Sequence, residues 1–194
     1  LGTRQGVVKR VAVQGPPTKR EWDLIALDDG DEVVGAQESA PGDDIVLIAS
    51  DAQVLRFPAD AVRPQGRTAS GMAGMRLAEG AELIACLSVA SDDPDALIVT
   101  VAGSRSALPG TSAFTAKVTA LADIPRKGRG TGGVRAHRFL RFEDVLVLGW
   151  AGAGPVRACA ASGAPLDLPA QLDKRDASGT PLTGSVASVA GPPR

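Results

Sequence analysis

The chain has 194 residues and a formal net charge of −1, from 21 Lys and Arg against 22 Asp and Glu. Its 23 Gly and 14 Pro residues disfavour long helices and favour short strands joined by turns. Tyr is absent and aromatic residues make up 3%, which excludes a tyrosine nucleophile in this chain and argues against aromatic platforms for sugars or nucleobases.

Charged residues are segregated along the chain. Residues 21–51 hold ten acidic side chains and no basic one. Residues 104–142 hold eight basic side chains and one acidic one, Asp123. This separation predicts a strong local field on a nearly neutral molecule.

The two cysteines, Cys86 and Cys159, lie in apolar surroundings and have no partner at metal-ligand spacing, so we expect small buried side chains. The sequence contains no apolar run of about 20 residues and no charged-then-apolar leader. These features predict a protein of the reducing cytoplasm with no membrane span.

Short apolar runs separated by turn residues predict four hairpins. The second turns at Ser50–Gln53, the third around Gly103-Ser104 and the fourth at Ser162-Gly163. The hairpins cover residues 3–10, 45–57, 97–108 and 156–168, and the first has a shortened first strand.

An Arg-Gly segment recurs between the hairpins. Gly66–Gly71 aligns with Gly128–Gly133, and Lys174–Gly179 matches again. In the first repeat only Lys19-Arg20 survives.

A third unit follows each Arg-Gly segment. Residues 27–36 align without a gap with residues 77–86, and residues 139–146 keep the apolar–acidic–apolar pattern. The repetition favours a hairpin turn at Asp28–Glu32 over a Ca²⁺ site, because the alternating ligand spacing and distal Glu of such a site are missing.

Four short strands per unit are typical of propeller blades, which must stack to form a core. We therefore predict one all-β domain over residues 1–194, with about four four-stranded antiparallel blades. Trp22 and Trp150 are expected to fill gaps between blades. The chain begins inside a hairpin, so we expect either that an upstream region has been removed, which we favour, or that the last strands near residues 182–189 close the ring with the first. The predicted repeats cover residues 1–44, 45–95, 96–154 and 155–190.

The run Thr3–Arg10 and the longer run Arg63–Leu77 resemble blades of the C-terminal domain of bacterial type IIA topoisomerase A subunits. These are the A subunits of DNA gyrase and topoisomerase IV. The resemblance implies a β-pinwheel, a propeller-like ring whose blades exchange strands. It also implies that the domain binds duplex DNA around its outer rim and bends it.

The gyrase members of this family carry a loop that reads Gln-Arg-Arg-Gly-Gly-Lys-Gly and wraps DNA chirally. The nearest stretch here is Lys127–Gly133, which keeps Arg129, Gly130 and Gly133. It differs at the other four positions, so either a topoisomerase IV-like or a divergent gyrase-like role fits the resemblance.

Binding a duplex without reading its sequence requires cations spaced along a surface, and Arg can grip a phosphate with two N–H groups. The recurring Arg-Gly segments predict such a rim; the alternative is that these arginines form an ordinary solvated face. A Gly beside an Arg is expected to let the loop approach the DNA. The predicted DNA-binding residues are Arg63, Arg67, Arg126, Lys127, Arg129, Arg135 and Arg138, with a first-repeat patch of Lys9, Arg10, Lys19 and Arg20.

No catalytic or metal-binding residues are predicted. His137, the only histidine, has no His or Cys cluster to join, and we expect it on a strand near DNA or solvent. Residues 128–133 lack the Gly-Lys-Ser/Thr end of a nucleotide-binding loop.

The resemblance implies a non-catalytic DNA-binding part of an ATP-hydrolysing topoisomerase, whose ATP, Mg²⁺ and cleavage tyrosine lie elsewhere in the enzyme. Its implied partners are double-stranded DNA and the other domains and subunits of that enzyme, at the nucleoid in the cytoplasm. The alternative from a different class is a protein-interaction β-propeller that uses its acidic first blade.

Overall fold

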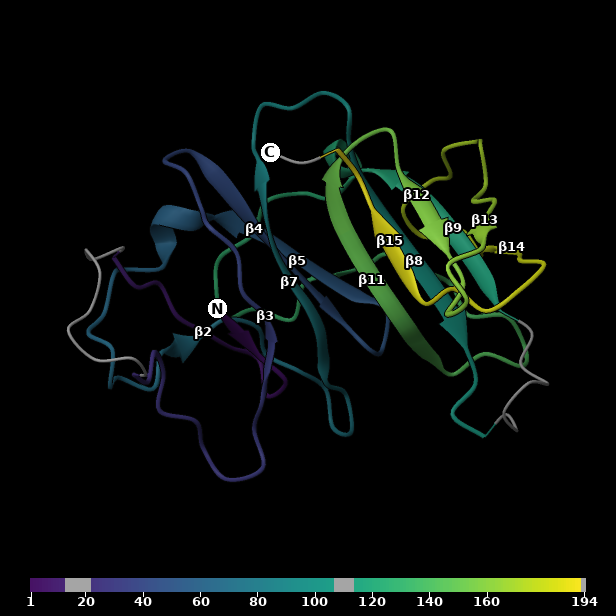
Figure 1. Cartoon of the computed structure of the whole chain (residues 1–194). Coiled ribbons are helices and arrows are strands. Elements are labelled where there is room, and N and C mark those ends of the chain that lie inside the picture. Colours follow the sequence, from purple (N-terminus) through teal and green to yellow (C-terminus); the bar gives the residue numbers. More distant parts are fainter. Residues whose placement is uncertain (13–21, 107–113, 193–194) are drawn as a thin grey trace.

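The computed structural model describes residues 1–12, 22–106 and 114–192. Its strands form four antiparallel sheets, with the first at the left of Figure 1 and the fourth at the right. The helices of the described part are two short 3₁₀ turns, η1 (Ala59–Ala61) and η2 (Leu121–Asp123). The predicted all-β fold is confirmed. Within the described residues, neither helix is long enough to cross a membrane.

Each sheet is built around one hairpin. The first sheet, ordered β3–β1–β2–β6, contains β1 (Gly2–Thr3), β2 (Val7–Val8), β3 (Val33–Gly35) and β6 (Met72–Ala73). The second, ordered β10–β5–β4–β7, contains β4 (Asp43–Ala49), β5 (Gln53–Pro58), β7 (Leu83–Ala90) and β10 (Val134–Arg135).

The other two sheets follow the same plan. The third, ordered β11–β8–β9–β14, contains β8 (Ala96–Gly103), β9 (Thr115–Ala120), β11 (Val145–Ala153) and β14 (Thr180–Pro181). The fourth, ordered β13–β12–β15, contains β12 (Arg157–Cys159), β13 (Pro165–Leu166) and β15 (Ser188–Ala190).

One strand of each four-stranded sheet comes from the next repeat along the chain. β6 lies in the second repeat but pairs with β2 of the first, with Met72 opposite Val8. β10 joins β5 in the same way, and β14 joins β9. The strand exchange implied by the resemblance is therefore present. Three sheets have the predicted four strands, and the fourth has three within the described residues.

The third hairpin departs from the prediction. β8 ends at Gly103 and β9 begins at Thr115; the predicted return strand is wrong over residues 104–106, and residues 107–108 lie outside the described part of the chain. After Gly103 the chain turns towards the start of β11, where the Arg105 backbone N–H donates to Asp144 Oδ1 at 2.9 Å. This contact ties residue 105 to the start of β11 rather than to β8.

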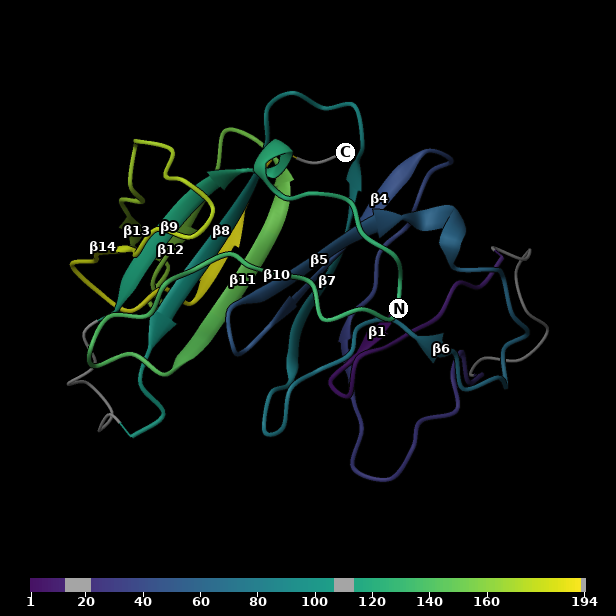
Figure 2. The ribbon, with the colours of Figure 1, turned by 180° about the vertical axis from the view of Figure 1, so that it is seen from behind.

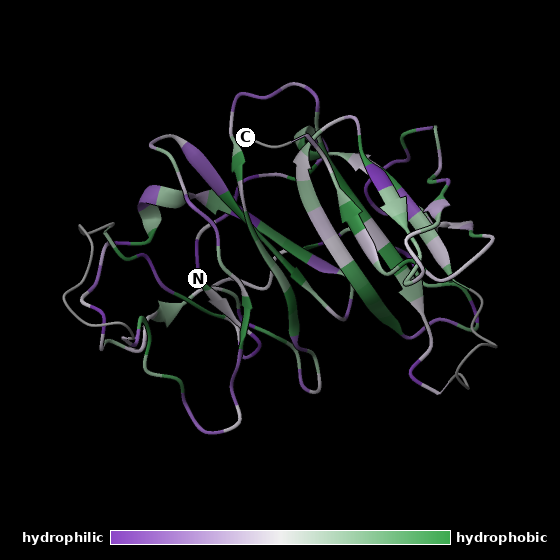
Figure 3. Ribbon diagram, in the orientation of Figure 1, coloured by the Kyte–Doolittle hydropathy of each residue, from purple (hydrophilic) through white to green (hydrophobic). Residues whose placement is uncertain are grey.

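The core lies between adjacent sheets, and β4 is buried on both faces. Val46 and Ile48 pack on the side of the third sheet, in one cluster with Ile98 and Leu146. Leu47 packs on the side of the first sheet, in a second cluster with Val8, Leu55, Phe57 and Leu83. Figure 3 shows the hydrophobic residues concentrated on these central strands. Burial of each such side chain contributes about 1.5–3 kcal/mol, so stacking of the sheets supplies the stability that one sheet lacks.

His137 is 1% exposed, which corrects the expectation that it lies near DNA or solvent. Its Nε2 accepts the Gly179 backbone N–H at 3.1 Å, and its Nδ1 lies 2.9 Å from Thr100 Oγ1. Burial, together with the positive charge of Lys117, lowers the pKa of His137 to about 4. The ring is therefore neutral at pH 7, with Nε2 as acceptor and Nδ1–H as donor.

The two tryptophans differ. Trp150 on β11 is partly buried against Gly152 and Gly191. Trp22 is 44% exposed, so the prediction that it fills a gap between blades is wrong.

Cys86 packs against Gly2 and Gly35, and burial raises the pKa of its thiol to about 11.

Candidate nucleic-acid interface

Three connectors carry the Arg-Gly segments. We define them as residues 62–71, 124–133 and 172–179; each leads from a hairpin to an exchanged strand. Near the start of each connector, one backbone N–H donates to the hairpin of the preceding repeat. These hydrogen bonds are Gln65 N–H to Arg10 O at 2.9 Å, Lys127 N–H to Arg56 O at 2.8 Å, and Asp173 N–H to Val118 O at 2.9 Å.

The second and third connectors also contact the segment that directly follows the connector before them. The Arg76 backbone N–H donates to Thr131 O at 3.1 Å, and Gly130 N–H donates to Gly74 O at 2.7 Å. At the next junction, Arg138 N–H donates to Ala177 O at 3.0 Å. Backbone hydrogen bonds thus link the connectors into one strip. In Figure 2 the chain leading into β10 crosses the face turned towards the viewer.

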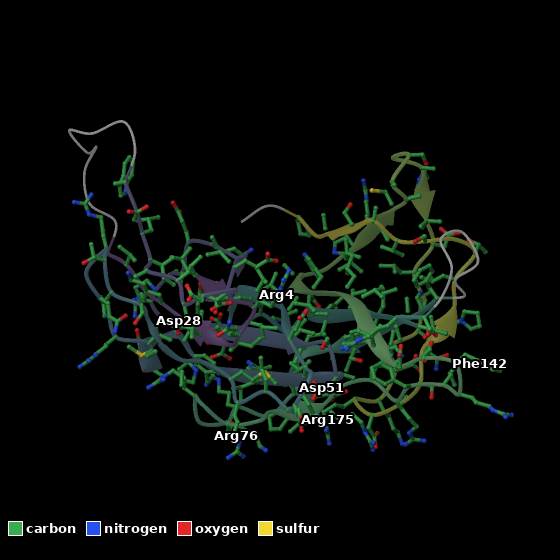
Figure 4. The ribbon with its side chains drawn as sticks, turned by 90° about the horizontal axis from the view of Figure 1, so that it is seen from below. Arg4, Asp28, Asp51, Arg76, Phe142 and Arg175 are labelled. Carbon is green, nitrogen blue, oxygen red and sulfur yellow. The ribbon has the colours of Figure 1, made fainter. Side chains whose placement is uncertain are left out.

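An arginine occupies the same place in every connector. Arg67, Arg129 and Arg175 each lie two residues after the anchoring N–H. In Figure 4, Arg76 and Arg175 project from the same edge of the molecule. The Arg175 guanidinium donates to Arg135 O at 2.9 Å, across the junction of two connectors.

Arg76 and Arg175 are absent from the sequence-predicted site. For Arg175 the signal was available, because the alignment of residues 174–179 already placed it at the repeated arginine position. For Arg76 the signal was available as well, because the offset that aligns Gly66–Gly71 with Gly128–Gly133 also pairs Arg76 with the predicted residue Arg138.

Several predicted cations reach solvent. Arg63, Arg67, Lys127 and Arg135 are exposed. The Lys127 amine donates to Gly133 O of its own connector at 3.2 Å. Within the described residues, no hydrogen bond or ion pair holds the side chains of Arg63, Arg67 and Arg135. Their guanidinium groups can therefore accept an anionic ligand without breaking an existing contact.

Other predicted cations are held by protein groups. Arg126 Nε lies 2.9 Å from Oδ2 of Asp44, a carboxylate that is fully buried and also holds the buried Arg56 at 2.6 Å. Arg129 donates to the carbonyls of Ala61 and Ala73. These side chains keep part of their surface open, with 48% of the Arg126 side chain exposed.

Arg138 and Arg10 each face a carboxylate. Arg138 Nη2 lies 3.6 Å from Asp176, with 59% of its side chain exposed. Arg10 Nη1 lies 3.0 Å from Asp60, with 29% of its side chain exposed. An anionic ligand at either residue competes with the carboxylate.

Lys9 does not lie on the rim, which corrects its predicted role as a surface contact. It is 2% exposed, and its amine donates to the carbonyls of Leu24, Arg67 and Ala69, each at 2.6 Å. Burial lowers its pKa. Lys9 instead holds the backbone beneath Arg67, and is therefore a positioning residue. The predicted residues Lys19 and Arg20 lie outside the described part of the chain.

Lys117 repeats this arrangement under the third connector. It is 1% exposed and donates to the carbonyls of Lys174, at 3.1 Å, and Arg175. Burial lowers the pKa of Lys117 to about 8. A buried amine thus supports the backbone of the repeated arginine in two of the three connectors.

The acidic residues of the first repeat form the predicted turn, but not within a hairpin, because residues 22–27 before it belong to no strand. The Asp31 backbone N–H donates to Asp28 O at 3.0 Å, and Gly30 has a φ of 74°. The Asp31 carboxylate accepts the Gln5 backbone N–H at 2.9 Å, so the turn also supports the first hairpin. In Figure 4, Asp28 and Arg4 lie away from the edge where Arg76 and Arg175 project. Within the described ranges, no three His, Cys, Asp or Glu side chains gather to hold a metal ion.

Comparison with known proteins finds similar sequences in the A subunits of DNA gyrase. A family described as the DNA gyrase C-terminal domain, beta-propeller, matches residues 43–90 and 115–138. The DNA gyrase A subunit of Mycobacterium tuberculosis is 35% identical over 151 residues, which cover 76% of this chain and 17% of the relative. The DNA gyrase A subunit of Salmonella typhimurium is 33% identical over 136 residues, covering 69% and 14%.

Solved structures have the same fold. The C-terminal domain of DNA topoisomerase IV superposes with a TM-score of 0.77 at 20% identity, over 97% of this chain and 59% of that one. The DNA gyrase A C-terminal domain gives a TM-score of 0.73 at 18% identity, over 97% and 63%. The chain spans 17% or less of the length of the gyrase subunits it matches.

Proposed function

We propose that this chain, which belongs to the family of C-terminal β-pinwheel domains found in the A subunits of DNA gyrase and topoisomerase IV, binds duplex DNA along its connector strip and bends it. The observation that carries the proposal is the arginine repeated at one place in each connector, Arg67, Arg129 and Arg175, on connectors joined by backbone hydrogen bonds. A row of such groups along one strip suits a duplex, because a duplex presents phosphates along its whole length.

The chemistry of the strip favours phosphate over other anions. Guanidinium groups present paired N–H donors that fit phosphate oxygens, and releasing condensed counterions makes such contacts favourable at low salt. Among the described residues, the strip has no strand or helix positioned to enter a groove of the duplex. We therefore propose that it binds DNA with little sequence preference. Since the connectors follow successive sheets, a duplex that contacts all of them is bent along the molecule.

We further propose that the chain acts within a gyrase-like or topoisomerase IV-like enzyme at the nucleoid in the cytoplasm. There it presents bound DNA to the strand-passage parts of that enzyme. Strand cleavage and ATP hydrolysis belong, in this proposal, to other parts of the assembly.

The test is the salt dependence of duplex binding, measured by fluorescence anisotropy between about 50 and 200 mM salt. The double variant Arg67→Ala, Arg135→Ala removes two exposed cations from the strip. We expect it to weaken binding to every duplex sequence and to reduce the slope of log affinity against log salt by about 2.

The matched control is Arg141→Ala, Arg157→Ala, which removes the same charge from exposed arginines outside the connectors. It should leave the slope close to that of the original chain. Equal losses in both double variants would mean that net charge alone, rather than the strip, governs binding. No binding at the lowest salt would exclude the proposed function.

A further inference from the structure

The second connector is held differently from the other two. In the first and third, the buried amines of Lys9 and Lys117 support the backbone of the repeated arginine. Each lysine directly precedes the residue whose carbonyl accepts the anchoring N–H of the connector. For the second connector the residue in this place is Leu55, which is fully buried and has no side-chain donor. Another arrangement takes the place of the amine there.

Asp44 and Arg56 hold the second connector through Arg126. The Asp44 carboxylate is fully buried, and its Oδ2 accepts Arg56 Nε at 2.6 Å and Arg126 Nε at 2.9 Å. Arg56 is 9% exposed and also donates to the carbonyls of Leu121 at 3.0 Å and Ser91 at 3.3 Å. Every nitrogen of the Arg56 guanidinium is therefore used inside the protein. Its charge offsets that of Asp44, so the charge of Arg126 is not cancelled.

Arg126 is held only through its Nε. Among the described residues, no hydrogen bond or ion pair involves its Nη1 or Nη2, and 48% of its side chain is exposed. Other arginines in or beside the connectors that protein groups hold each use an Nη atom. These contacts are Arg129 Nη1 with Ala73 O, Arg175 Nη1 with Arg135 O, Arg138 Nη2 with Asp176, and Arg10 Nη1 with Asp60. Arg126 thus combines a fixed guanidinium with an outer end that can still donate two parallel hydrogen bonds.

Granted that the strip binds DNA as proposed above, we infer that Asp44 and Arg56 are positioning residues that present Arg126 to one DNA phosphate. Two parallel N–H groups are the arrangement that grips a phosphate best. An unheld side chain such as Arg67 loses rotamer freedom when it binds, whereas Arg126 has already lost that freedom on folding. The phosphate contact of Arg126 is therefore stronger than that of an unheld arginine of the same charge.

The experiment measures the affinity of the whole chain for one short duplex at about 100 mM salt, by fluorescence anisotropy. Arg126→Lys keeps the charge, but one ammonium group cannot stay on Asp44 and also grip a phosphate with two parallel donors. It should lower the affinity about tenfold. The matched control is Arg67→Lys, the same change at an exposed arginine that no protein group holds within the described residues. The control should lower the affinity less than about threefold.

A second pair of variants separates positioning from simple charge. Asp44→Asn and Asp60→Asn each remove one negative charge beside an arginine, and charge alone predicts that both tighten DNA binding. Asp60 occupies an outer nitrogen of Arg10, so Asp60→Asn should not weaken binding. Asp44→Asn should weaken it about threefold, because a neutral acceptor holds Arg126 less firmly. Circular dichroism checks that each variant folds, and Arg126→Lys remains the test if Asp44→Asn does not.

The results tell a failure of the positioning role from a failure of the proposed function. No DNA binding by the original chain would overturn both. If the original chain binds and Arg126→Lys and Arg67→Lys weaken it equally, the positioning role alone is overturned. Tighter binding by a folded Asp44→Asn chain would overturn it as well, and would leave the proposed function standing.

Discussion

Cationic side chains have two different roles in this molecule. Lys9 and Lys117 are buried and donate to backbone carbonyls beneath Arg67 and Arg175. Arg67 itself is exposed. Their charge alone predicts that all of these side chains lie on the surface, so sequence reasoning places Lys9 on the rim. The arrangement of carbonyls that makes its burial favourable exists only after the connector has folded over it.

His137 makes the stability of the fold depend on pH. Its pKa is about 4 in the folded chain and about 6.5 when unfolded. The unfolded state therefore binds a proton between these values while the folded state does not, so stability falls as the pH falls through this window. Between pH 7 and 5 we expect this residue to cost about 2 kcal/mol of unfolding free energy.

Urea unfolding of the original chain and of His137→Gln at pH 7 and pH 5 measures this contribution. The variant should be less stable at pH 7 but should lose about 2 kcal/mol less than the original chain on acidification. Equal losses in the two proteins would show that carboxylates, rather than His137, account for the pH dependence.

At the scale of elements, the register of the connectors was predictable from sequence. The Arg-Gly segments at 66–71, 128–133 and 174–179 occupy equivalent positions because the same hydrogen bonds anchor each of them. The contact between Arg105 and the start of β11 was not predictable from the hairpin pattern, because it joins residues 39 positions apart in the sequence. The exposure of Trp22 was not predictable either, because apolar character alone does not report how far neighbouring residues cover a side chain.

The last glycine of the connector serves the fold, in contrast to the expectation that glycines here bring the loop close to DNA. Gly133 has a φ of 76°, and a Cβ there would lie 2.5 Å from Val54 O of the neighbouring strand. Gly133→Ala should therefore cost at least about 2 kcal/mol of unfolding free energy, from backbone strain and from moving β10 away from β5.

Gly128→Ala in the same connector is the matched control for this prediction. A Cβ there meets no heavy atom closer than 3.9 Å. Urea unfolding should find Gly128→Ala within about 0.5 kcal/mol of the original chain. If both variants were equally stable, the close approach of the connector to β5 would not be what requires glycine at 133.

At the scale of the whole molecule, folding sharpens the separation of charge along the sequence. Arg76 and Arg175 project from one edge in Figure 4, whereas Asp28 lies away from it. Burial also removes some charges from the surface, including Asp44, Arg56 and Lys117. The proposed function relies on the remaining cations of the connectors to attract a polyanion to a nearly neutral chain.

The most direct measurement is arginine modification by phenylglyoxal, with and without bound duplex DNA, read out by mass spectrometry. The account predicts that DNA protects Arg63, Arg67 and Arg135 on the connectors and β10, and leaves Arg141 and Arg157 as reactive as before. Protection of Arg141 and Arg157 with unchanged reactivity along the connectors would contradict it.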